Sequence, residues 1–222
     1  IASVCSRLGK KSIEMEHVGK SYEGETLFSG FSYTVLRRDR LGIVGENGCG
    51  KSTLLKLLCG QVDPDEGKIE WGETVKIGYV SQEGTEMDPE LRVYDYIQQA
   101  GGSIHTGKEI LSTSQMLERF LFPPQVQYNR IGKLSGGERR RLYLLRILME
   151  APNILLLDEP TNDLDIETLT VLEDYLEEFN GAVIAVSHDR YFLDKLADHL
   201  FAYEEGKWAP YTGGYSDYLQ KR

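Results

Sequence analysis

Residues 41–60 read LGIVGENGCGKSTLLKLLCG, and this stretch decides the fold. A short apolar run is followed by Gly45-Glu46-Asn47-Gly48-Cys49-Gly50-Lys51-Ser52, which fits the phosphate-loop pattern G-x-x-x-x-G-K-[ST]. Residues 54–58 are then helical in composition. A strand, a glycine-rich loop and a helix in that order predict a nucleoside-triphosphate site at the helix N-terminus.

The chemistry of this loop follows from its residue types. Glycines let the backbone turn tightly, so that N–H groups between Gly45 and Thr53 point at phosphate oxygens. Lys51 is expected to reach the β- and γ-phosphates, and the Ser52 hydroxyl to bind Mg²⁺. The plain alternative, a glycine-rich turn with an exposed lysine, is disfavoured by the flanking strand and helix. The loop alone does not choose ATP over GTP.

A second chemical site is predicted at the end of the apolar run 154–157. Asp158 and Glu159 follow that run directly. In P-loop ATPases an aspartate at such a strand end holds Mg²⁺, and we assign that role to Asp158. A carboxylate one residue further on can accept a proton from the attacking water, which suits Glu159. A solvated acidic turn is the alternative, and pairing with the phosphate loop makes it the weaker one.

Apolar strand patterns alternate with helical patterns along most of the chain. Predicted strands cover residues 13–18, 31–35, 41–44, 77–80, 154–157, 182–186, 200–203 and 208–211, and predicted helices cover 54–58, 137–149, 168–179 and 190–196. This alternation predicts an α/β fold with a mainly parallel sheet and helices on both faces. The polar stretch 83–133 carries two helical patterns, 93–99 and 110–120, and is predicted to be a small helical insertion.

Composition excludes several classes of protein. No apolar run approaches the ~18 residues that span a bilayer, and no signal-peptide pattern is present at the N-terminus. The formal net charge of −10 disfavours non-specific nucleic-acid binding. The three cysteines, Cys5, Cys49 and Cys59, lack metal-ligand spacing and suggest reduced thiols in a cytoplasmic protein.

The segment Leu134-Ser135-Gly136-Gly137-Glu138 directly precedes a predicted helix. Serine and two glycines at a helix N-terminus form an anion site, and Ser135 with Glu138 also fits a helix capping box. The segment resembles the signature motif of the ABC ATPase superfamily. The resemblance covers residues 12 to about 218, and we treat 12–222 as one cassette. It implies a P-loop core with an antiparallel β subdomain and a helical subdomain at about 83–133.

The resemblance also implies roles for further residues in the same order. Tyr22 has the spacing of the aromatic that stacks on adenine, although tyrosines are common near strand ends. Gln82 resembles the glutamine that senses Mg²⁺ and links to the helical subdomain. His188 ends an apolar strand and resembles the histidine that contacts the γ-phosphate.

In this family the signature motif faces the nucleotide of another cassette, in the same polypeptide or a homodimer. Asn162-Asp163-Leu164-Asp165 resembles the loop that crosses that interface. The resemblance therefore implies a composite ATPase, with Mg²⁺ as cofactor. Catalysis is expected from Glu159, His188, Lys51 and Gln82, and metal binding from Ser52, Gln82 and Asp158.

Three motifs resemble the ABC-F branch, whose members are soluble proteins with two cassettes that act mostly on the ribosome. The motifs are DEPTNDLD at 158–165, SHDRYFLD at 187–194 and YTGGYSDYL at 211–219. Residues 1–11, with Arg7, Lys10 and Lys11, resemble the end of an inter-cassette linker. The chain is thus expected to be a second cassette, whose ribosome or RNA contacts come mainly from parts of the protein outside this sequence.

Alternative interpretations stay open at this point. The chain resembles, less closely, the ATPase subunit of a membrane ABC transporter, or a chromosome or DNA-repair ATPase of the same superfamily. Cys49 lies at a phosphate-binding helix N-terminus, where a thiol pKa can be lowered, but an inert small side chain is the simpler interpretation. Arg139-Arg140-Arg141 suggests an RNA patch, yet helical geometry spreads the three side chains and favours a solvated or interface face.

Overall fold

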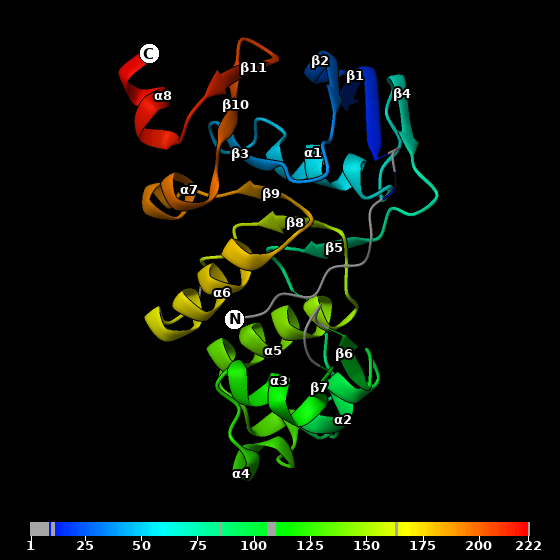
Figure 1. The fold of residues 1–222 in the computed structure, drawn as a ribbon. Coiled ribbons are helices and arrows are strands. Elements are labelled where there is room, and N and C mark those ends of the chain that lie inside the picture. Colours follow the sequence, from blue (N-terminus) through cyan, green and yellow to red (C-terminus); the bar gives the residue numbers. More distant parts are fainter. Residues whose placement is uncertain (1–8, 10–11, 85, 106–109, 163, 222) are drawn as a thin grey trace.

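The computed structural model describes residues 9, 12–84, 86–105, 110–162 and 164–221, without the side chains of 103–105. These described residues form three sheets and their covering helices (Figure 1). The strands are β1 Ile13–Tyr22, β2 Glu25–Thr34, β3 Arg40–Val44, β4 Glu66–Trp71, β5 Ile77–Val80, β6 Ser103–His105, β7 Ile110–Ser112, β8 Ile154–Asp158, β9 Ala182–Val186, β10 His199–Glu204 and β11 Lys207–Thr212. The helices are α1 Lys51–Leu58, α2 Val93–Gln98, α3 Thr113–Arg119, α4 Pro124–Gln127, η1 Ile131–Lys133, α5 Gly136–Met149, α6 Ile166–Glu178, α7 Arg190–Leu196 and α8 Tyr215–Lys221.

The central sheet has six strands in the order β11-β10-β3-β9-β8-β5. Every neighbouring pair is parallel except the β10–β11 hairpin. The predicted α/β class with a mainly parallel sheet is therefore confirmed. The carboxyl ends of β3, β5, β8 and β9 meet at one edge of the sheet, where ligands bind in open parallel sheets.

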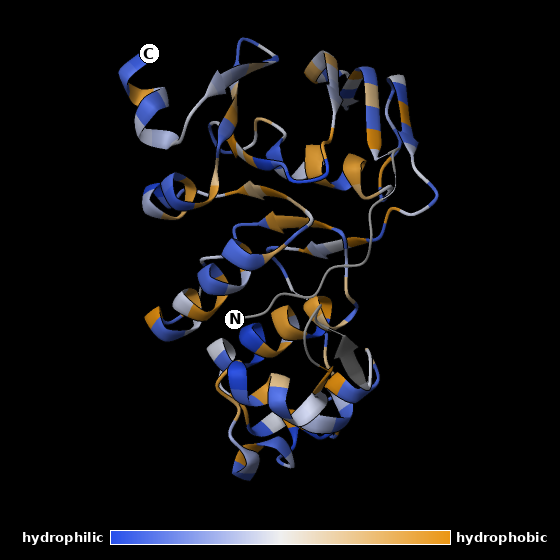
Figure 2. Cartoon of the chain, in the orientation of Figure 1, coloured by the Kyte–Doolittle hydropathy of each residue, from blue (hydrophilic) through white to orange (hydrophobic). Residues whose placement is uncertain are grey.

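The central strands are apolar at every position because both faces of the sheet are covered. In β8, Leu155 and Leu157 belong to one buried cluster with α5, α6 and α7, whereas Ile154 and Leu156 belong to another with α1, β1 and β2. Side chains alternate across a strand, so one continuous apolar run supplies both cores. Figure 2 shows β8 and β9 as hydrophobic, while the outer helices carry hydrophilic stretches.

An antiparallel sheet in the order β2-β1-β4 covers α1 on the side away from the central sheet (Figure 1). This is the antiparallel β subdomain that the family resemblance implied. The prediction from composition missed β4, because its sequence EGKIEW leaves only Ile69 partly buried and gives no strong strand pattern. It also missed the C-terminal helix α8, which buries Tyr218.

The predicted helical insertion contains helices α2, α3 and α4 and the short η1, but it is not entirely helical. The predicted helix over 110–120 is wrong at its start, because Ile110–Ser112 pairs with Ser103–His105 as a hairpin. The Ser112 side chain then caps α3 in a capping box with Gln115. A cap residue with extended backbone ends the strand and begins the helix at one position.

Two further expectations fall largely outside the described residues. The expected linker remnant, 1–11, lies outside them except for Gly9, and Asp163 of the interface loop does too. No helix in the described part of the chain is long and apolar enough to cross a membrane.

Candidate functional site

The phosphate loop joins the buried strand β3 to helix α1, and its glycines are required by the backbone. Gly50 is the N-cap of α1 with φ 103°, in the left-handed region that side chains disfavour. Gly45 is required by close approach instead. A Cβ there would lie 2.7 Å from the Cys49 Sγ and 2.8 Å from the Cβ of Tyr203. The loop can therefore bring its backbone N–H groups toward a phosphate without side chains in between.

Lys51 lies across this loop. Its side chain is buried, and its Nζ donates to the carbonyl oxygens of Gly45 and Glu46, each at 2.8 Å. An ammonium group has three donors, so these two bonds leave one for a phosphate oxygen. The lysine thus holds the loop in shape and carries the positive charge that a triphosphate needs.

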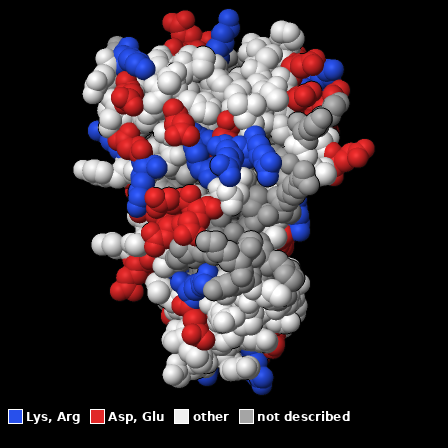
Figure 3. All heavy atoms as spheres, viewed as in Figure 1, with Lys and Arg blue, Asp and Glu red and all other residues white. Residues whose placement is uncertain are grey.

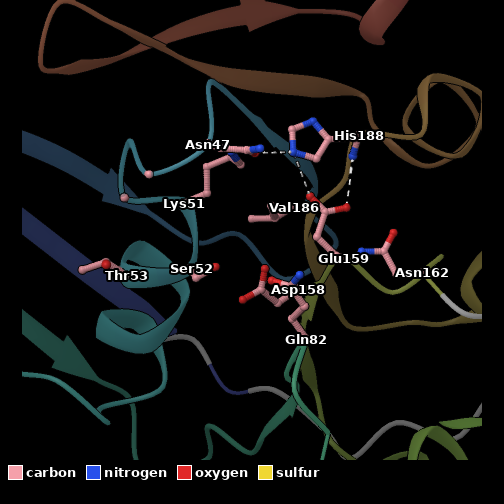
Figure 4. A pocket seen from close by; sticks show the side chains of 12 residues that line it. Asn47, Lys51, Ser52, Thr53, Gln82, Asp158, Glu159, Asn162, Val186 and His188 are labelled. Atoms are coloured by element: carbon pink, nitrogen blue, oxygen red, sulfur yellow. Dashed lines mark hydrogen bonds and ion pairs between the residues drawn. The ribbon is translucent and has the colours of Figure 1, made fainter.

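Asp158 ends strand β8 and is 2% exposed. Its Oδ2 accepts a hydrogen bond from the Tyr79 hydroxyl at 3.3 Å. Its Oδ1 is buried and has no hydrogen-bond partner among the described residues. Figure 4 shows Asp158 and Ser52 facing one another across the cavity. A buried carboxylate oxygen without a donor, opposite a hydroxyl, fits a hard cation such as Mg²⁺, which uses few protein carboxylates together with water and phosphate.

Glu159 is buried and adopts a left-handed backbone with φ 48°, which is unusual for a residue other than glycine. Its N–H donates to the Val186 carbonyl at 2.9 Å, which ties the turn to the end of β9. Its Oε2 accepts from the His188 backbone N–H at 3.2 Å. This strained turn places the carboxylate in the cavity rather than in solvent.

The His188 ring connects the Glu159 carboxylate to the phosphate loop. Its Nε2 lies 3.3 Å from Glu159 Oε1 and 3.1 Å from Asn47 Oδ1 (Figure 4). Because both partners are oxygen acceptors, we assign the hydrogen to Nε2. Burial raises the pKa of Glu159 above its ordinary value, and the nearby His188 with its N–H partly opposes that shift.

The raised pKa of Glu159 predicts the pH dependence of hydrolysis. Only the ionised carboxylate accepts a proton, so turnover should fall toward acid pH with a midpoint above the ordinary glutamate value of ~4.3. Hydrolysis rates measured between about pH 5 and 8 check this, with nucleotide binding at the same pH values as the control. A midpoint in the range of free glutamate would contradict the buried position of this group.

These groups line one cavity of about 490 Å³. The structure thus brings together most predicted residues of one half-site, which are Asn47, Gly48, Gly50, Lys51, Ser52, Thr53, Gln82, Asp158, Glu159, Asn162 and His188. Gly45 and Glu46 line an adjoining hollow of about 1090 Å³ that also includes His188. Tyr22 lies apart at the end of β1, is 47% exposed and has the Lys20 Nζ 5.4 Å from its ring centre.

The signature segment does not line the phosphate-loop cavity. Ser135 caps α5 as predicted: its Oγ accepts from the Glu138 N–H at 3.2 Å, and Glu138 Oε2 accepts from the Ser135 N–H at 2.7 Å. Leu134 is buried beneath the cap, and, apart from its neighbours along the helix, no described residue lies within 4 Å of where a Cβ of Gly136 would lie. Gly136 and Gly137 line a separate hollow with Gln82. The first turn of α5 therefore faces outward, toward whatever binds there.

The predicted interface loop leads from this cavity into helix α6. Asn162 lines the cavity and donates its backbone N–H to the Glu159 carbonyl at 3.2 Å. Leu164 is half-buried. Asp165 caps α6 by accepting from the Thr168 N–H at 2.7 Å. Asn162 and Asp165 thus connect the turn at Glu159 to the N-terminus of α6.

Two sequence interpretations require correction. Burial raises the pKa of the Cys49 thiol more than Lys51 and the backbone N–H groups lower it, which contradicts a lowered thiol pKa and agrees with the inert small side chain that was the simpler interpretation. The solvated or interface face favoured for the three arginines fits Arg139, which is exposed, but not Arg141. Arg141 is buried and donates to the Thr168 hydroxyl at 2.9 Å, and Arg140 donates to the Ser81 carbonyl at 2.6 Å.

Tyr79 contacts a residue of the candidate site and was not predicted from the sequence. It lies three residues before Gln82 on β5, and β5 pairs in parallel with β8, the strand that carries Asp158. The sequence did contain one indication that Tyr79 lies near Asp158: two apolar strands each end in polar residues, and strands of this kind pair in a parallel sheet. A single tyrosine in an apolar strand gives no further sign that its hydroxyl meets a carboxylate.

The fold and the site define a P-loop ATPase cassette. A protein-family model described as ABC transporter matches residues 28–162, and the chain therefore belongs to that family. It is an ABC ATPase cassette most like those of the ABC-F proteins, among which are Uup and EttA.

Three curated relatives illustrate the similarity. The chain is 52% identical over 217 residues to the "Uncharacterized ABC transporter ATP-binding protein YfmR" of Bacillus subtilis, covering 97% of this chain and 34% of that protein. It is 42% identical to the "Energy-dependent translational throttle protein EttA" of Escherichia coli K12, covering 96% and 38%. It is 41% identical to "ATP-binding protein Uup" of the same organism, covering 96% and 34%. The chain thus spans a little over a third of their length.

Solved structures share the fold. A bacterial Atm1-family ABC exporter with ATP bound superposes with a TM-score of 0.78 at 23% identity, over all of this chain and 42% of the other. The ATP-binding subunit of an ABC transporter gives 0.77 at 18% identity, over 95% and 93%. At these identities the likeness shows the fold alone.

Proposed function

We propose that this cassette binds MgATP in the phosphate-loop cavity and hydrolyses it when a second cassette closes over that cavity. The observation that carries the proposal is the convergence of Lys51, Ser52, Asp158, Glu159 and His188 on one cavity. Lys51 would neutralise the β- and γ-phosphates, and the loop N–H groups would bind their oxygens. Tyr22 would stack on the adenine from the end of β1.

Glu159 would act as the base in hydrolysis. Its carboxylate would accept a proton from the attacking water, and His188 would hold that carboxylate and reach the γ-phosphate. Ser52, Gln82 and Asp158 would hold Mg²⁺, which supplies charge neutralisation at the phosphates when bound. The buried Asp158 Oδ1, which has no hydrogen-bond partner among the residues that the structure describes, supports this assignment.

The second half of the nucleotide site would be the signature segment of another cassette. Ser135 and Gly136 begin α5, and this helix N-terminus is open on the outside of the chain. Helix N-termini attract anions through their N–H groups and their dipole. Since the segment does not line the phosphate-loop cavity of its own chain, we infer that it serves a nucleotide held by a partner.

A complementation experiment tests the composite site. Gly136→Glu places a negative charge where the partner's phosphate would approach, yet an acid in the first turn favours the helix. This variant and Lys51→Ala should each be inactive alone, and a mixture should recover part of the activity because one complete site forms per mixed pair. Wild-type turnover per chain should also rise with protein concentration.

Thermal unfolding of Gly136→Glu is the control, and its stability should equal or exceed that of the wild type. Full hydrolysis by Gly136→Glu alone, or a wild-type rate independent of concentration down to a strict monomer, would refute the composite site. Analytical sedimentation at the assay concentrations shows whether the chain is a monomer or a dimer in each measurement.

We further propose that the cassette belongs to a longer cytoplasmic protein of the ABC-F kind that works on the ribosome. The supporting observations are the similarity to EttA, whose name describes a translational throttle, and to Uup. Direct RNA contact through α6 is disfavoured, because acidic side chains gather over that helix in Figure 3, whereas Lys and Arg side chains gather above it on the same face. That helix carries Glu167, Glu173, Asp174, Glu177 and Glu178 and has no basic residue. Contacts with RNA would come from other parts of the longer protein, and the position of this cassette within it stays a prediction.

A further inference from the structure

The Asp158 carboxylate divides its two oxygens between different surroundings. Oδ2 faces strand β5 and accepts from the Tyr79 hydroxyl at 3.3 Å, whereas Oδ1 is buried without a partner in the described part of the chain. A carboxylate can rotate about its terminal bond, which has broad preferences. A hydrogen bond from the Tyr79 hydroxyl to Oδ2 therefore determines that Oδ1 is the oxygen left to bind a cation.

Tyr79 is well placed to set that orientation. Its strand, β5, is one of the two edge strands of the central sheet as described, and its register with β8 pairs Tyr79 with Leu156 and Val80 with Leu157. The tyrosine ring reaches forward from this position to the end of β8. Its own backbone carbonyl accepts a hydrogen bond from the Tyr143 hydroxyl of α5 at 3.4 Å. Strand pairing and this bond hold the Tyr79 backbone in place, and the bond from its hydroxyl to Asp158 Oδ2 shows where the side chain ends.

We propose that Tyr79 is a positioning residue that holds Asp158 with Oδ1 directed at the metal bound to the nucleotide. This inference rests on the proposed MgATP site. Residues that hydrogen-bond a metal-ligating carboxylate fix its direction, and their loss typically weakens metal affinity ~10–100-fold. Tyr79 would not touch the nucleotide, so its effect is on metal binding and not on the affinity for nucleotide alone.

The chain offers a matched control for removing this hydroxyl. Tyr33 also donates its phenol to an aspartate, Asp39 Oδ2 at 2.6 Å, but Asp39 lies just before β3, at the sheet end opposite the phosphate loop. Tyr79→Phe and Tyr33→Phe remove the same atom from a bond to an aspartate, and Tyr33→Phe also removes the contact of that hydroxyl with His199 Nε2 at 3.0 Å, so it is the harsher change. Both keep the ring and its packing, so both variants should fold.

The test compares metal and nucleotide binding in the three proteins. Binding of Mn²⁺ to the ADP-loaded chain is followed by electron paramagnetic resonance, and binding of ADP is followed by calorimetry in excess chelator. We expect Tyr79→Phe to weaken Mn²⁺ binding ~10-fold or more and to raise the Mg²⁺ concentration for half-maximal hydrolysis by a similar factor. ADP binding in chelator should not change, and Tyr33→Phe should match the wild type in every binding measurement.

The possible results distinguish failure of the positioning role of Tyr79 from failure of the proposed MgATP site. Wild-type affinity of Tyr79→Phe for Mn²⁺ would overturn the positioning role and leave the MgATP site intact. An equal loss in Tyr33→Phe would overturn it as well, because the effect would then be one of general stability. A wild-type chain that binds neither ADP nor Mn²⁺·ADP would overturn the proposed function itself.

Discussion

Replacing Glu159 with glutamine is expected to slow ATP hydrolysis by ~10²–10⁴-fold while leaving ATP binding close to that of the wild type. The amide keeps the shape of the side chain and its bond from the His188 N–H, but it cannot accept the proton of the attacking water. Binding is spared because the Lys51 ammonium and the loop N–H groups do not depend on this carboxylate. The variant should therefore accumulate in an ATP-bound, closed state.

Rapid-quench kinetics measure the expected loss of hydrolysis, and an equilibrium titration measures the expected retention of ATP binding.

The stability of the Glu159→Gln variant gives an independent check. Burial raises the pKa of Glu159, so the folded chain holds this proton more tightly than the unfolded chain does. The contribution of this group to stability then declines as pH rises through that window, and Glu159→Gln should unfold at a higher temperature at neutral pH. Near-normal hydrolysis by this variant would remove Glu159 from the mechanism.

The same substitution in the complete longer protein tests the proposed biological role. A protein arrested in the ATP-bound state should co-sediment with ribosomes when ATP is present, and should dissociate when ATP is absent. Stable association with a membrane complex instead, and with no ribosomal fraction, would favour the transporter alternative.

Replacing Lys51 with alanine is expected to weaken ATP binding by roughly 10²–10³-fold and so to abolish hydrolysis at ordinary ATP concentrations. Truncating one partner of a buried charge pair costs ~2–5 kcal/mol, and the lysine charge is buried beside the phosphate position. The change also removes the two bonds from Nζ to the Gly45 and Glu46 carbonyls, which hold the loop in shape.

Lys56→Ala is the matched control, because Lys56 lies on the same helix with its side chain exposed. It should bind ATP as the wild type does. Calorimetric titration with MgATP distinguishes the variants, and thermal unfolding without nucleotide shows how much of the loss comes from the loop itself. ATP affinity that survives in Lys51→Ala would place the nucleotide elsewhere.

Local rules explain why much of the fold could be predicted from the sequence. Glycines at 45, 48 and 50, Lys51 and the strand before them specify a strand–loop–helix unit without reference to distant residues. The capping box at Ser135 and Glu138 is a local pattern too, and the structure confirms both of its bonds. Strand β4 and the β6–β7 hairpin were not predicted, because short strands with few apolar residues are specified by their neighbours.

The sequence by itself determined the chemical groups and their order: a phosphate loop, a strand ending in Asp158 and Glu159, and a signature helix. Tertiary structure alone decided which atoms face one another. Parallel pairing of β5 with β8 brings the Tyr79 hydroxyl to one oxygen of Asp158, and the left-handed turn at Glu159 places its carboxylate against the His188 ring, which also meets Asn47. Such contacts join residues 29 to 141 positions apart. The spacing of apolar residues along the chain reflects local structure only, so it does not predict these long-range contacts.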